Sequence, residues 1–235
     1  MRPGLPLMIP AAGFGTRMGA LTAQRPKPLI KVAGRALIDR ALDLAAEAGC
    51  DPVVVNLHYL GQQIADHLAG RPVHLSWERD LILDTGGGLR QALPILGAGP
   101  VATLNPDGVW TGPNPLISLT DHWDLARMDG LLMLAPVETV YPSGGRSDFS
   151  MDEAGRLTRH SERGGQGYVY LGTQIIRTEG LARIDVPVFS TNLLWDQMIA
   201  AGRAYGLLHP GGWCDVGRPE GIAEAEAMLR AAGHV

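Results

Sequence analysis

The stretch Leu5–Pro28, LPLMIPAAGFGTRMGALTAQRPKP, decides the fold of this chain. Its first six residues form a short apolar run that predicts a buried strand, and two closely spaced glycines, Gly13 and Gly15, follow soon after. Small residues after a first strand let backbone N–H groups approach and point at a phosphate group. The stretch therefore predicts an α/β protein with a phosphate-binding loop at the carboxyl end of its first strand.

Short apolar runs alternate with helical patterns through the first 140 residues. Ala36–Ala48 has apolar residues at helical spacing, whereas Pro52–Leu57 is a β-branched run typical of a buried strand. The other expected strands are Val73–Trp77, Val101–Asn105, Leu131–Pro136 and Val169–Arg177, and the other expected helices are Gly61–Leu68, Gly87–Leu96, His122–Met128, Thr191–Ala201 and Pro219–Ala232. This alternation predicts βαβ units and a mixed, mostly parallel Rossmann-like sheet flanked by helices.

The later part of the chain changes character. Tyr141–Gly167 is rich in Gly, Ser and charged residues, which predicts hairpins and loops. The chain shows no linker, repeat or low-complexity tract, so we expect one domain over 1–235, with a core at about 1–140 and a smaller lid region at about 141–235. The lid should lie over the carboxyl edge of the sheet, where open α/β sheets bind ligands.

Composition and charge argue against several classes of protein. A net charge of −4 and a pI near 6.0 give no field that would attract nucleic acid or an anionic membrane. No apolar run approaches the roughly 18 residues that cross a bilayer. We expect no signal peptide, a cytoplasmic location, and free thiols at Cys50 and Cys214.

Two positively charged residues lie in the opening stretch. Arg17 can hold phosphate oxygens with its fork of donors, and Lys27 stands between two prolines that stiffen its backbone. Phosphorylated reactants repel each other, so a site that joins two of them needs cations at fixed positions. Arg17 and Lys27 are therefore candidate catalytic residues.

The glycine turn alone has other interpretations. A dinucleotide fingerprint would carry a third glycine, which is missing from Gly13–Met18. It would also have an acidic residue at the end of the second strand, and that residue is missing too. A Walker loop would continue as Gly-Lys-Ser or Gly-Lys-Thr, which is also missing, and a plain structural turn remains open. The combination of Gly-x-Gly-Thr-Arg, Leu-Thr and Pro-Lys-Pro is much more specific than a lone Gly-rich loop.

This combination resembles the signature of the sugar nucleotidyltransferase family, the A-type Rossmann-like nucleotidyltransferases. The resemblance covers nearly the whole chain, and it is greatest to small bacterial members that act on N-acetylmuramate 1-phosphate. The matching stretches are Gly61–Leu68, Leu83–Gly88 and Gly212–Gly217. The resemblance implies transfer of a nucleotidyl group from a nucleoside triphosphate, UTP in that branch, to a sugar 1-phosphate. The products would be a nucleotide-sugar and pyrophosphate, and the branch implies a role in peptidoglycan recycling.

The resemblance also implies positions that hold the nucleotide. Arg17 and Lys27 would contact the triphosphate and the attacking sugar phosphate. The implied nucleotide-binding residues are Ala11, Ala12, Gly13, Gly15, Thr16, Glu78, Thr85, Gly86 and Gly87. Glu78 can accept from an imino N–H, which uracil, thymine and guanine all carry, so it does not choose among them. The structural alternative is a tight strand-to-helix turn at Gly86–Gly88 with a solvated Glu78.

Two aspartates are candidate magnesium ligands. A magnesium ion that bridges phosphates needs only one or two protein carboxylates. Asp107 follows an expected strand, and Asp215 lies in an apolar segment where its alternative is a buried ion pair. The family usually has Gly-Asp at the first position. In this chain Pro106 replaces the glycine and Gly108 is an insertion, so a displaced carboxylate is the alternative for Asp107.

The sugar would lie against the lid region. The implied sugar-binding residues are Asn105, Gly145, Arg146, Asp148 and Glu162. Arg146 can pair with a carboxylate such as the lactyl group of muramic acid, and a solvated loop arginine is the alternative. His160 and His209 are expected at the surface or in packing.

The expected chemistry is an in-line displacement that needs no general base, since the attacking phosphate oxygen is already anionic. The expected partners are a nucleoside triphosphate, a sugar 1-phosphate and Mg²⁺, without nucleic acid or membrane. A guanylyl-, thymidylyl- or cytidylyltransferase acting on mannose, glucose or another phosphorylated acceptor is an alternative. A non-catalytic nucleotide-sugar sensor is another. The oligomeric state is open.

Overall fold

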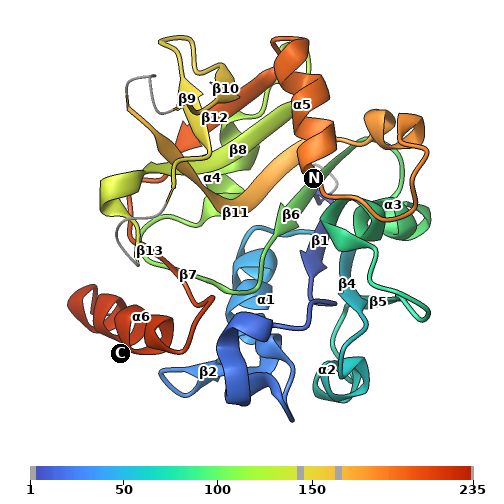
Figure 1. Ribbon diagram of the computed structural model, residues 1–235, viewed down its shortest axis with the longest axis vertical. Coiled ribbons are helices and arrows are strands. Elements are labelled where there is room, and N and C mark those ends of the chain that lie inside the picture. The colour runs from blue at the N-terminus through green and yellow to red at the C-terminus, as the bar shows by residue number, and fades with distance from the viewer. Residues whose placement is uncertain (1–3, 142–145, 162–165, 234–235) are drawn as a thin grey trace.

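A mixed sheet forms the centre of the fold in the computed structural model, which describes residues 4–141, 146–161 and 166–233 (Figure 1). Nine strands of these residues make up the sheet, in the order β10-β9-β11-β6-β1-β4-β5, with β8 pairing β11 and β12. The strands are β1 (Leu7–Pro10), β4 (Val53–Leu57), β5 (His74–Trp77), β6 (Pro100–Leu104), β8 (Gly130–Pro136), β9 (Phe149–Met151), β10 (Leu157–Arg159), β11 (Tyr168–Arg177) and β12 (Ala204–Leu208).

The four strands β5, β4, β1 and β6 are parallel neighbours, as the alternation of strands and helices predicts. β11 runs antiparallel to both β6 and β8 and joins the parallel part of the sheet to the later region. The expected fold class, a mixed α/β sheet flanked by helices, is therefore confirmed. The hairpin of β9 and β10 lies in the segment that was expected to form hairpins and loops.

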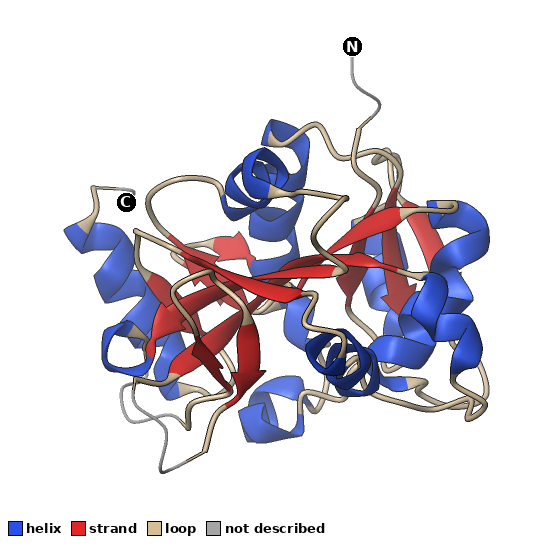
Figure 2. Cartoon of the chain, turned by 90° about the horizontal axis from the view of Figure 1, so that it is seen from above, coloured by secondary structure: helices blue, strands red, loops and turns tan. Residues whose placement is uncertain are grey.

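Helices cover both faces of the sheet (Figure 2). They are α1 (Leu37–Glu47), α2 (Gly61–His67), α3 (Asp84–Leu96), α4 (Pro115–His122), α5 (Asn192–Ala200) and α6 (Glu220–Ala231). Successive residues of β1 point to opposite faces, so Leu7 and Ile9 pack with α1, α2 and α4, whereas Met8 packs with α3 and α5. Burial on both faces explains why the central parallel strands β1 and β4 are mostly apolar.

A third apolar cluster lies beside the main sheet. It joins the 3-10 helix η1 (Thr16–Thr22), through Met18, to the strand pair β7 (Gly108–Trp110) and β13 (Trp213–Asp215) and to α6. Met18 is only 1% exposed, so the phosphate loop is anchored in this cluster by a side chain of its own. A short strand pair, β2 (Lys31–Val32) and β3 (Arg35–Ala36), follows the 3-10 helix η2 (Lys27–Leu29).

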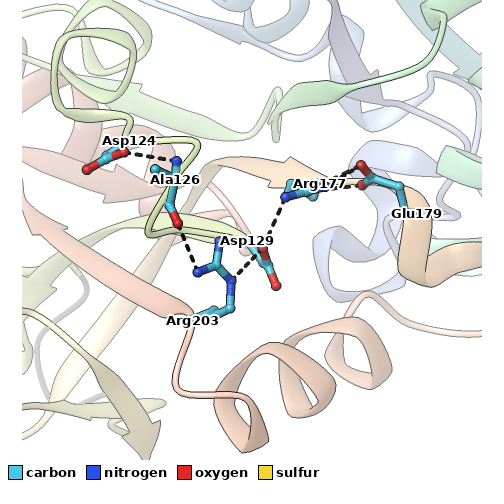
Figure 3. Close-up of polar contacts among 6 residues, drawn as sticks. All are labelled: Asp124, Ala126, Asp129, Arg177, Glu179 and Arg203. Carbon is cyan, nitrogen blue, oxygen red and sulfur yellow. Dashed lines mark hydrogen bonds and ion pairs between the residues drawn. The ribbon is translucent and has the colours of Figure 1, made fainter.

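The prediction of a helix at His122–Met128 is wrong. The helix lies earlier, at Pro115–His122, because Asn114 caps it with its side chain and proline fits the first helical position. The backbone at Trp123 is extended, and the carboxylate of Asp124 accepts from a backbone N–H two residues later, which makes a turn (Figure 3). The position of this helix is therefore set by the capping residue Asn114 and not by the apolar pattern that follows it.

Charged side chains join the strands β8, β11 and β12 at one end. Asp129, just before β8, accepts from Arg203 at 2.9 Å and lies 3.7 Å from Arg177, which also pairs with Glu179 (Figure 3). These side chains are partly exposed, so the pairs contribute little to stability. Cys50 and Cys214 are free thiols, and no helix among the described ranges is long and apolar enough to cross a membrane.

Replacing Asn114 by Ala should lower the free energy of unfolding by about 2 kcal/mol. The buried amide caps α4 and also donates to the Leu44 carbonyl at 2.9 Å and to Glu47 at 3.0 Å, which ties α4 to α1. Asn114→Ser keeps an oxygen for the cap and should lose about half as much. Urea unfolding followed by circular dichroism measures both, and an alanine variant as stable as the parent would contradict this account of the cap.

Candidate active site

A cleft of about 320 Å³ opens at the carboxyl ends of β1, β4, β5 and β6. Open α/β sheets bind ligands at this edge. The residues that line it are Pro10, Ala11, Ala12, Gly13, Gly15, Thr16, Arg17, Lys27, Pro28, Asn56, Glu78, Ile82, Asp84, Thr85, Asn105, Pro106, Asp107 and Gly217. The structure thus brings together both candidate catalytic residues, Asp107 and most of the candidate nucleotide-binding residues.

The conformation of the phosphate loop requires glycine at position 15. Gly15 has φ 64°, a left-handed conformation, and a Cβ there would lie 3.0 Å from side-chain atoms of Lys27 and Thr22. The Thr22 hydroxyl, 3.1 Å from the Gly15 carbonyl, holds the loop from behind. Arg17 then extends from η1 with 61% of its side chain exposed, so it is available to an anion in the cleft.

The two candidate metal ligands lie next to each other. β7 and β13 pair so that Asp215 is opposite Gly108, and the Val216 N–H donates to the Asp107 carbonyl at 2.9 Å. A Cβ at Gly108 would lie 2.8 Å from the Trp213 indole nitrogen, so the inserted residue must be small for this pair to form. Gly108 is the first residue of β7, and Asp107 just before it lines the cleft.

Charges of opposite sign meet at this point. Lys27 Nζ lies 2.5 Å from Asp107 Oδ2, and Arg17 Nη1 lies 3.8 Å from Asp215 Oδ2. Burial raises the pKa of the Asp215 carboxyl above its ordinary value, and the neighbouring Asp107 carboxylate raises it further. Lys27 and Arg17 act in the other direction. Two carboxylates that repel each other therefore depend on nearby positive charge.

The donor set fits a hard divalent cation such as magnesium. Asp107 and Asp215 offer carboxylate oxygens, which are the ligands that Mg²⁺ prefers, and added positive charge would relieve their repulsion. No group of three or more His, Cys, Asp or Glu side chains that could hold a metal occurs in the described parts of the chain. A metal held by these two aspartates would complete its shell with water and phosphate oxygens.

Glu78 is a buried support and not a solvated side chain. It is 2% exposed, and one carboxylate oxygen accepts from Asn56 Nδ2 at 2.6 Å while the other accepts from the Leu83 N–H at 2.7 Å. Asn56 in turn accepts from the Ala11 N–H at 2.6 Å. This chain of hydrogen bonds fixes the end of β1 relative to the turn before α3, and it shapes this part of the cleft.

The structure does not bring Gly86 and Gly87 into the lining of the cleft. Both backbone N–H groups donate to the Phe189 carbonyl, at 2.9 and 3.1 Å, and a Cβ at Gly86 would lie 2.4 Å from the Phe189 ring. Both glycines lie inside α3 and not in a turn before it, and they let the segment around Phe189 pack closely against the start of this helix. Thr85 is the residue of this run that faces both the cleft and the adjoining cavity.

The candidate sugar-binding residues lie in different parts of the structure. Asn105 lines the cleft, whereas Arg146 and Asp148 are exposed and line neither the cleft nor the cavity beside it. The Asp148 carboxylate accepts from the Tyr170 N–H at 2.9 Å, so it supports β11. Gly145 and Glu162 lie outside the described residues. His209 is buried and packs against Trp110, as expected for a packing residue.

Sequence reasoning missed a second cavity of about 190 Å³, which we call the side cavity. It shares Pro10, Thr85 and Asn105 with the cleft. Its other lining residues are Met8, Thr103, Tyr170, Gln174, Ser190, Thr191 and Trp195. The register of β11 against β8 shifts between Tyr170 and Gln174, and bulges of this kind re-aim side chains. The sequence feature that could have indicated this cavity is Gln174, a glutamine inside an apolar strand. A buried amide needs hydrogen-bond partners, so its position in such a strand points to a polar site.

The comparisons with known proteins agree with this geometry. The family described as "MobA-like NTP transferase domain" matches residues 7–148. The N-acetylmuramate alpha-1-phosphate uridylyltransferase of Caulobacter vibrioides is 38% identical over 94% of this chain and 96% of its own length. The enzyme of the same name from Neisseria meningitidis serogroup B is 34% identical over 95% of this chain and 98% of its own.

Solved structures with the same fold include HddC from Yersinia pseudotuberculosis complexed with GMP-PN, with a TM-score of 0.76 and 20% identity over 95% of this chain and 98% of that chain. A putative glucose-1-phosphate thymidylyltransferase from Bacillus anthracis has a TM-score of 0.79 and 13% identity over 97% of this chain and 96% of that chain. Fold, site and relatives thus define a nucleotidyltransferase. The chain belongs to the MobA-like NTP transferase family and, within it, to the sugar-1-phosphate nucleotidyltransferases.

Arg17→Ala and Lys27→Ala should each lower kcat/KM at least about a hundredfold, or about 2.7 kcal/mol, because each removes a fixed cation that faces the charge of the transition state. Arg17→Lys should rescue only partly, since a point charge cannot make a two-pronged contact. Pyrophosphate release measures the effect. Arg25→Ala is the matched control, because Arg25 is exposed in the same segment and does not line the cleft.

Thermal unfolding of the same samples separates catalysis from structure. The melting temperature of the Arg17→Ala variant should match that of the parent, because most of this side chain is exposed. Lys27 is only 13% exposed, and its loss leaves Asp107 beside Asp215 without its partner, so some loss of stability is expected there. Near-normal turnover in either alanine variant would refute the role assigned to that residue.

Proposed function

We propose that this protein transfers the uridylyl group of UTP to N-acetylmuramate 1-phosphate in a magnesium-dependent reaction. The products are UDP-N-acetylmuramate and pyrophosphate, which would place the protein in nucleotide-sugar biosynthesis and peptidoglycan recycling. The observation that carries the proposal is the pair Asp107 and Asp215 at the cleft, opposed by Lys27 and Arg17. The names of the two most similar relatives described above supply the donor and the acceptor.

The reaction needs positioning and charge from the protein. A phosphate oxygen of the sugar 1-phosphate attacks the α-phosphorus, the new P–O bond forms, and the bond to the β-phosphate breaks with release of pyrophosphate. The nucleophile is already an anion, so no side chain has to remove a proton. Arg17 and Lys27 hold the phosphates in line and offset their repulsion.

Asp107 and Asp215 would hold the magnesium ion. When bound, the ion neutralises charge on the phosphates and offsets the charge that develops on the leaving group. The uracil would lie near Ala11, Ala12 and Thr85, in the pocket that Asn56 and Glu78 keep in shape. Asn105 lies between this pocket and the side cavity, at the position where a sugar phosphate can reach the α-phosphorus.

Removal of the metal should abolish turnover, and Asp107→Asn and Asp215→Asn should each lower kcat at least about a hundredfold, because each removes a ligand charge at the reacting phosphates. Pyrophosphate release is measured with and without a chelator, and Mn²⁺ binding is measured by electron paramagnetic resonance. Asp121→Asn, at an exposed position on α4, is the matched control. Full turnover in the chelator would end the proposal of a metal-dependent enzyme.

A matrix of triphosphates against sugar 1-phosphates tests the donor and the acceptor. UTP, GTP, dTTP and CTP are each combined with the 1-phosphates of N-acetylmuramate, N-acetylglucosamine, glucose and mannose, and pyrophosphate is measured. We expect UTP with N-acetylmuramate 1-phosphate to give the highest kcat/KM. Glucose or mannose 1-phosphate used about a hundredfold better, a difference of about 2.7 kcal/mol, would refute this acceptor. No pyrophosphate with any pair would favour a nucleotide-sugar sensor.

A further inference from the structure

The side cavity is lined by polar but uncharged groups. Among the residues that the structure describes, the ten that line it are neutral, in contrast to the cleft, where Arg17, Lys27 and Asp107 meet. Burial raises the pKa of the Tyr170 hydroxyl above its ordinary value, so this group also stays neutral. A cavity of this kind favours a neutral polar ligand group over a carboxylate or a phosphate, because burying a charge without a partner is costly.

The start of α5 offers no free anion site to the side cavity. The Asn192 N–H donates to the Ser190 hydroxyl at 3.2 Å, and the N–H groups of Leu194 and Trp195 donate to the Thr191 carbonyl at 3.0 Å. The first N–H groups of a helix attract anions only where they lack partners. This helix end therefore adds no reason to place a charged group in the cavity.

Gln174 presents a buried amide donor to the side cavity. Its side chain is 2% exposed, and its Oε1 accepts from the Trp195 indole N–H at 2.6 Å. An indole nitrogen can only donate, so the amide oxygen must face Trp195 and the NH₂ group must face away from it. No acceptor in the described part of the chain takes the Nε2 hydrogens. Among the described residues, the Nε2 atom is not one of the fully buried atoms that lack a partner, so it is open to the cavity, where an acceptor on a ligand can take its hydrogens.

The position of the side cavity relates it to one part of the acceptor. The cavity shares Asn105 with the cleft, and Asn105 lies two residues before Asp107 in the sequence. In a sugar 1-phosphate the substituent on C2 is the ring substituent next to the reacting phosphate. A group on C2 can therefore enter the cavity while the phosphate stays in the cleft. A cavity of about 190 Å³ suits such a substituent and not a second nucleotide.

The walls of the cavity match an acetamido group. Trp195 and Tyr170 pack edge to face with ring centroids 4.9 Å apart, and with Met8 they form an apolar wall for a methyl group. The free Gln174 amide can donate to a ligand carbonyl oxygen, and the hydroxyl of Thr191 can accept from a ligand N–H. A lone sugar hydroxyl would leave this apolar wall unfilled.

We propose that the side cavity binds the 2-acetamido group of the sugar and that Gln174 is the residue that selects for it. This assignment rests on the proposed function, since it concerns the acceptor of the same reaction. It assigns the preference for 2-acetamido sugars to the side cavity, and it places the charged lactyl group of muramic acid outside that cavity.

Two acceptors that differ only at C2 test the assignment. N-acetylglucosamine 1-phosphate carries an acetamido group where glucose 1-phosphate has a hydroxyl, and pyrophosphate release with UTP and magnesium is measured for each. We expect kcat/KM to be at least about tenfold higher for the acetamido sugar, since a pocket that buries a methyl group discriminates by roughly 10–200-fold. Equal efficiencies, or a preference for glucose 1-phosphate, would overturn the proposal.

Gln174→Met removes the amide donor and keeps the length of the side chain. We expect this variant to lose most of the preference for the acetamido sugar, measured as the ratio of kcat/KM for the two acceptors. Gln62→Met is the matched control, because Gln62 is exposed on α2 and should keep the parent ratio. An equal fall with both acceptors in Gln174→Met would indicate a packing role and overturn the proposal.

The substitution leaves the Trp195 indole N–H without its partner, so folding is controlled separately. The double variant Gln174→Met with Trp195→Phe removes donor and acceptor together and is tested in the same way, with circular dichroism and melting temperature on each sample. We expect the double variant to show the same loss of preference. A double variant that folds and keeps the parent ratio would overturn the role of Gln174.

A binding measurement needs no turnover and separates the two proposals. Isothermal titration with UDP-N-acetylglucosamine and UDP-glucose should show tighter binding of the acetamido compound by the parent, lost in Gln174→Met. Pyrophosphate release without any preference in binding or turnover would refute the side-cavity assignment and leave the proposed function standing. No pyrophosphate with any acceptor, together with a binding preference lost in Gln174→Met, would refute the proposed function and support the assignment.

Discussion

The cleft depends on the attraction between Lys27 and Asp107, which joins the segment after β1 to the end of β6 across 80 residues of chain. Asp215, brought from the C-terminal part by the pairing of β13 with β7, places a second carboxylate beside the first. Two partly buried carboxylates repel each other, and the nearby Lys27 and Arg17 offset this repulsion. A site with paired carboxylates and two cations suits phosphates bound together with a metal.

The features that the sequence predicts well are those encoded by neighbouring residues. The strand β1, the glycine turn and the two cations lie within Leu5–Pro28, so their chemistry could be interpreted without knowledge of long-range contacts. The central strands β1 and β4 could be recognised because they are mostly apolar on both faces. The position of Asp107 in the cleft could be predicted because it comes shortly after β6, whose carboxyl end lies at the ligand edge of the sheet.

The features that were missed depend on contacts between distant segments. Gly86 and Gly87 look like residues that open a helix to a nucleotide, and only the approach of Phe189 shows that they are needed for packing. Glu78 was expected to accept from a nucleobase, and only the contacts with Asn56 and Leu83 show that both of its carboxylate oxygens already accept hydrogen bonds. The short strands β7 and β13 carry no pattern of their own, because three residues cannot show an alternation. The side cavity lies mainly between β11 and α5, both within the later region 141–235, and its lining residues are too far apart in sequence to be grouped beforehand.

The bulge in β11 explains how one strand can serve both the sheet and the side cavity. Gly172 has φ 80°, and its carbonyl accepts from the Asn105 N–H at 2.8 Å, so the strand stays paired to the end of β6 at that point. A Cβ at Gly172 would lie 3.0 Å from the Asn105 side chain, and the absence of one allows Asn105 to remain between the cleft and the side cavity. The charged cleft and the neutral side cavity therefore meet at Asn105. Because the two are built from different chemical groups, residues of β11 and α5 that line the side cavity can change without altering Arg17, Lys27 and Asp107 in the cleft.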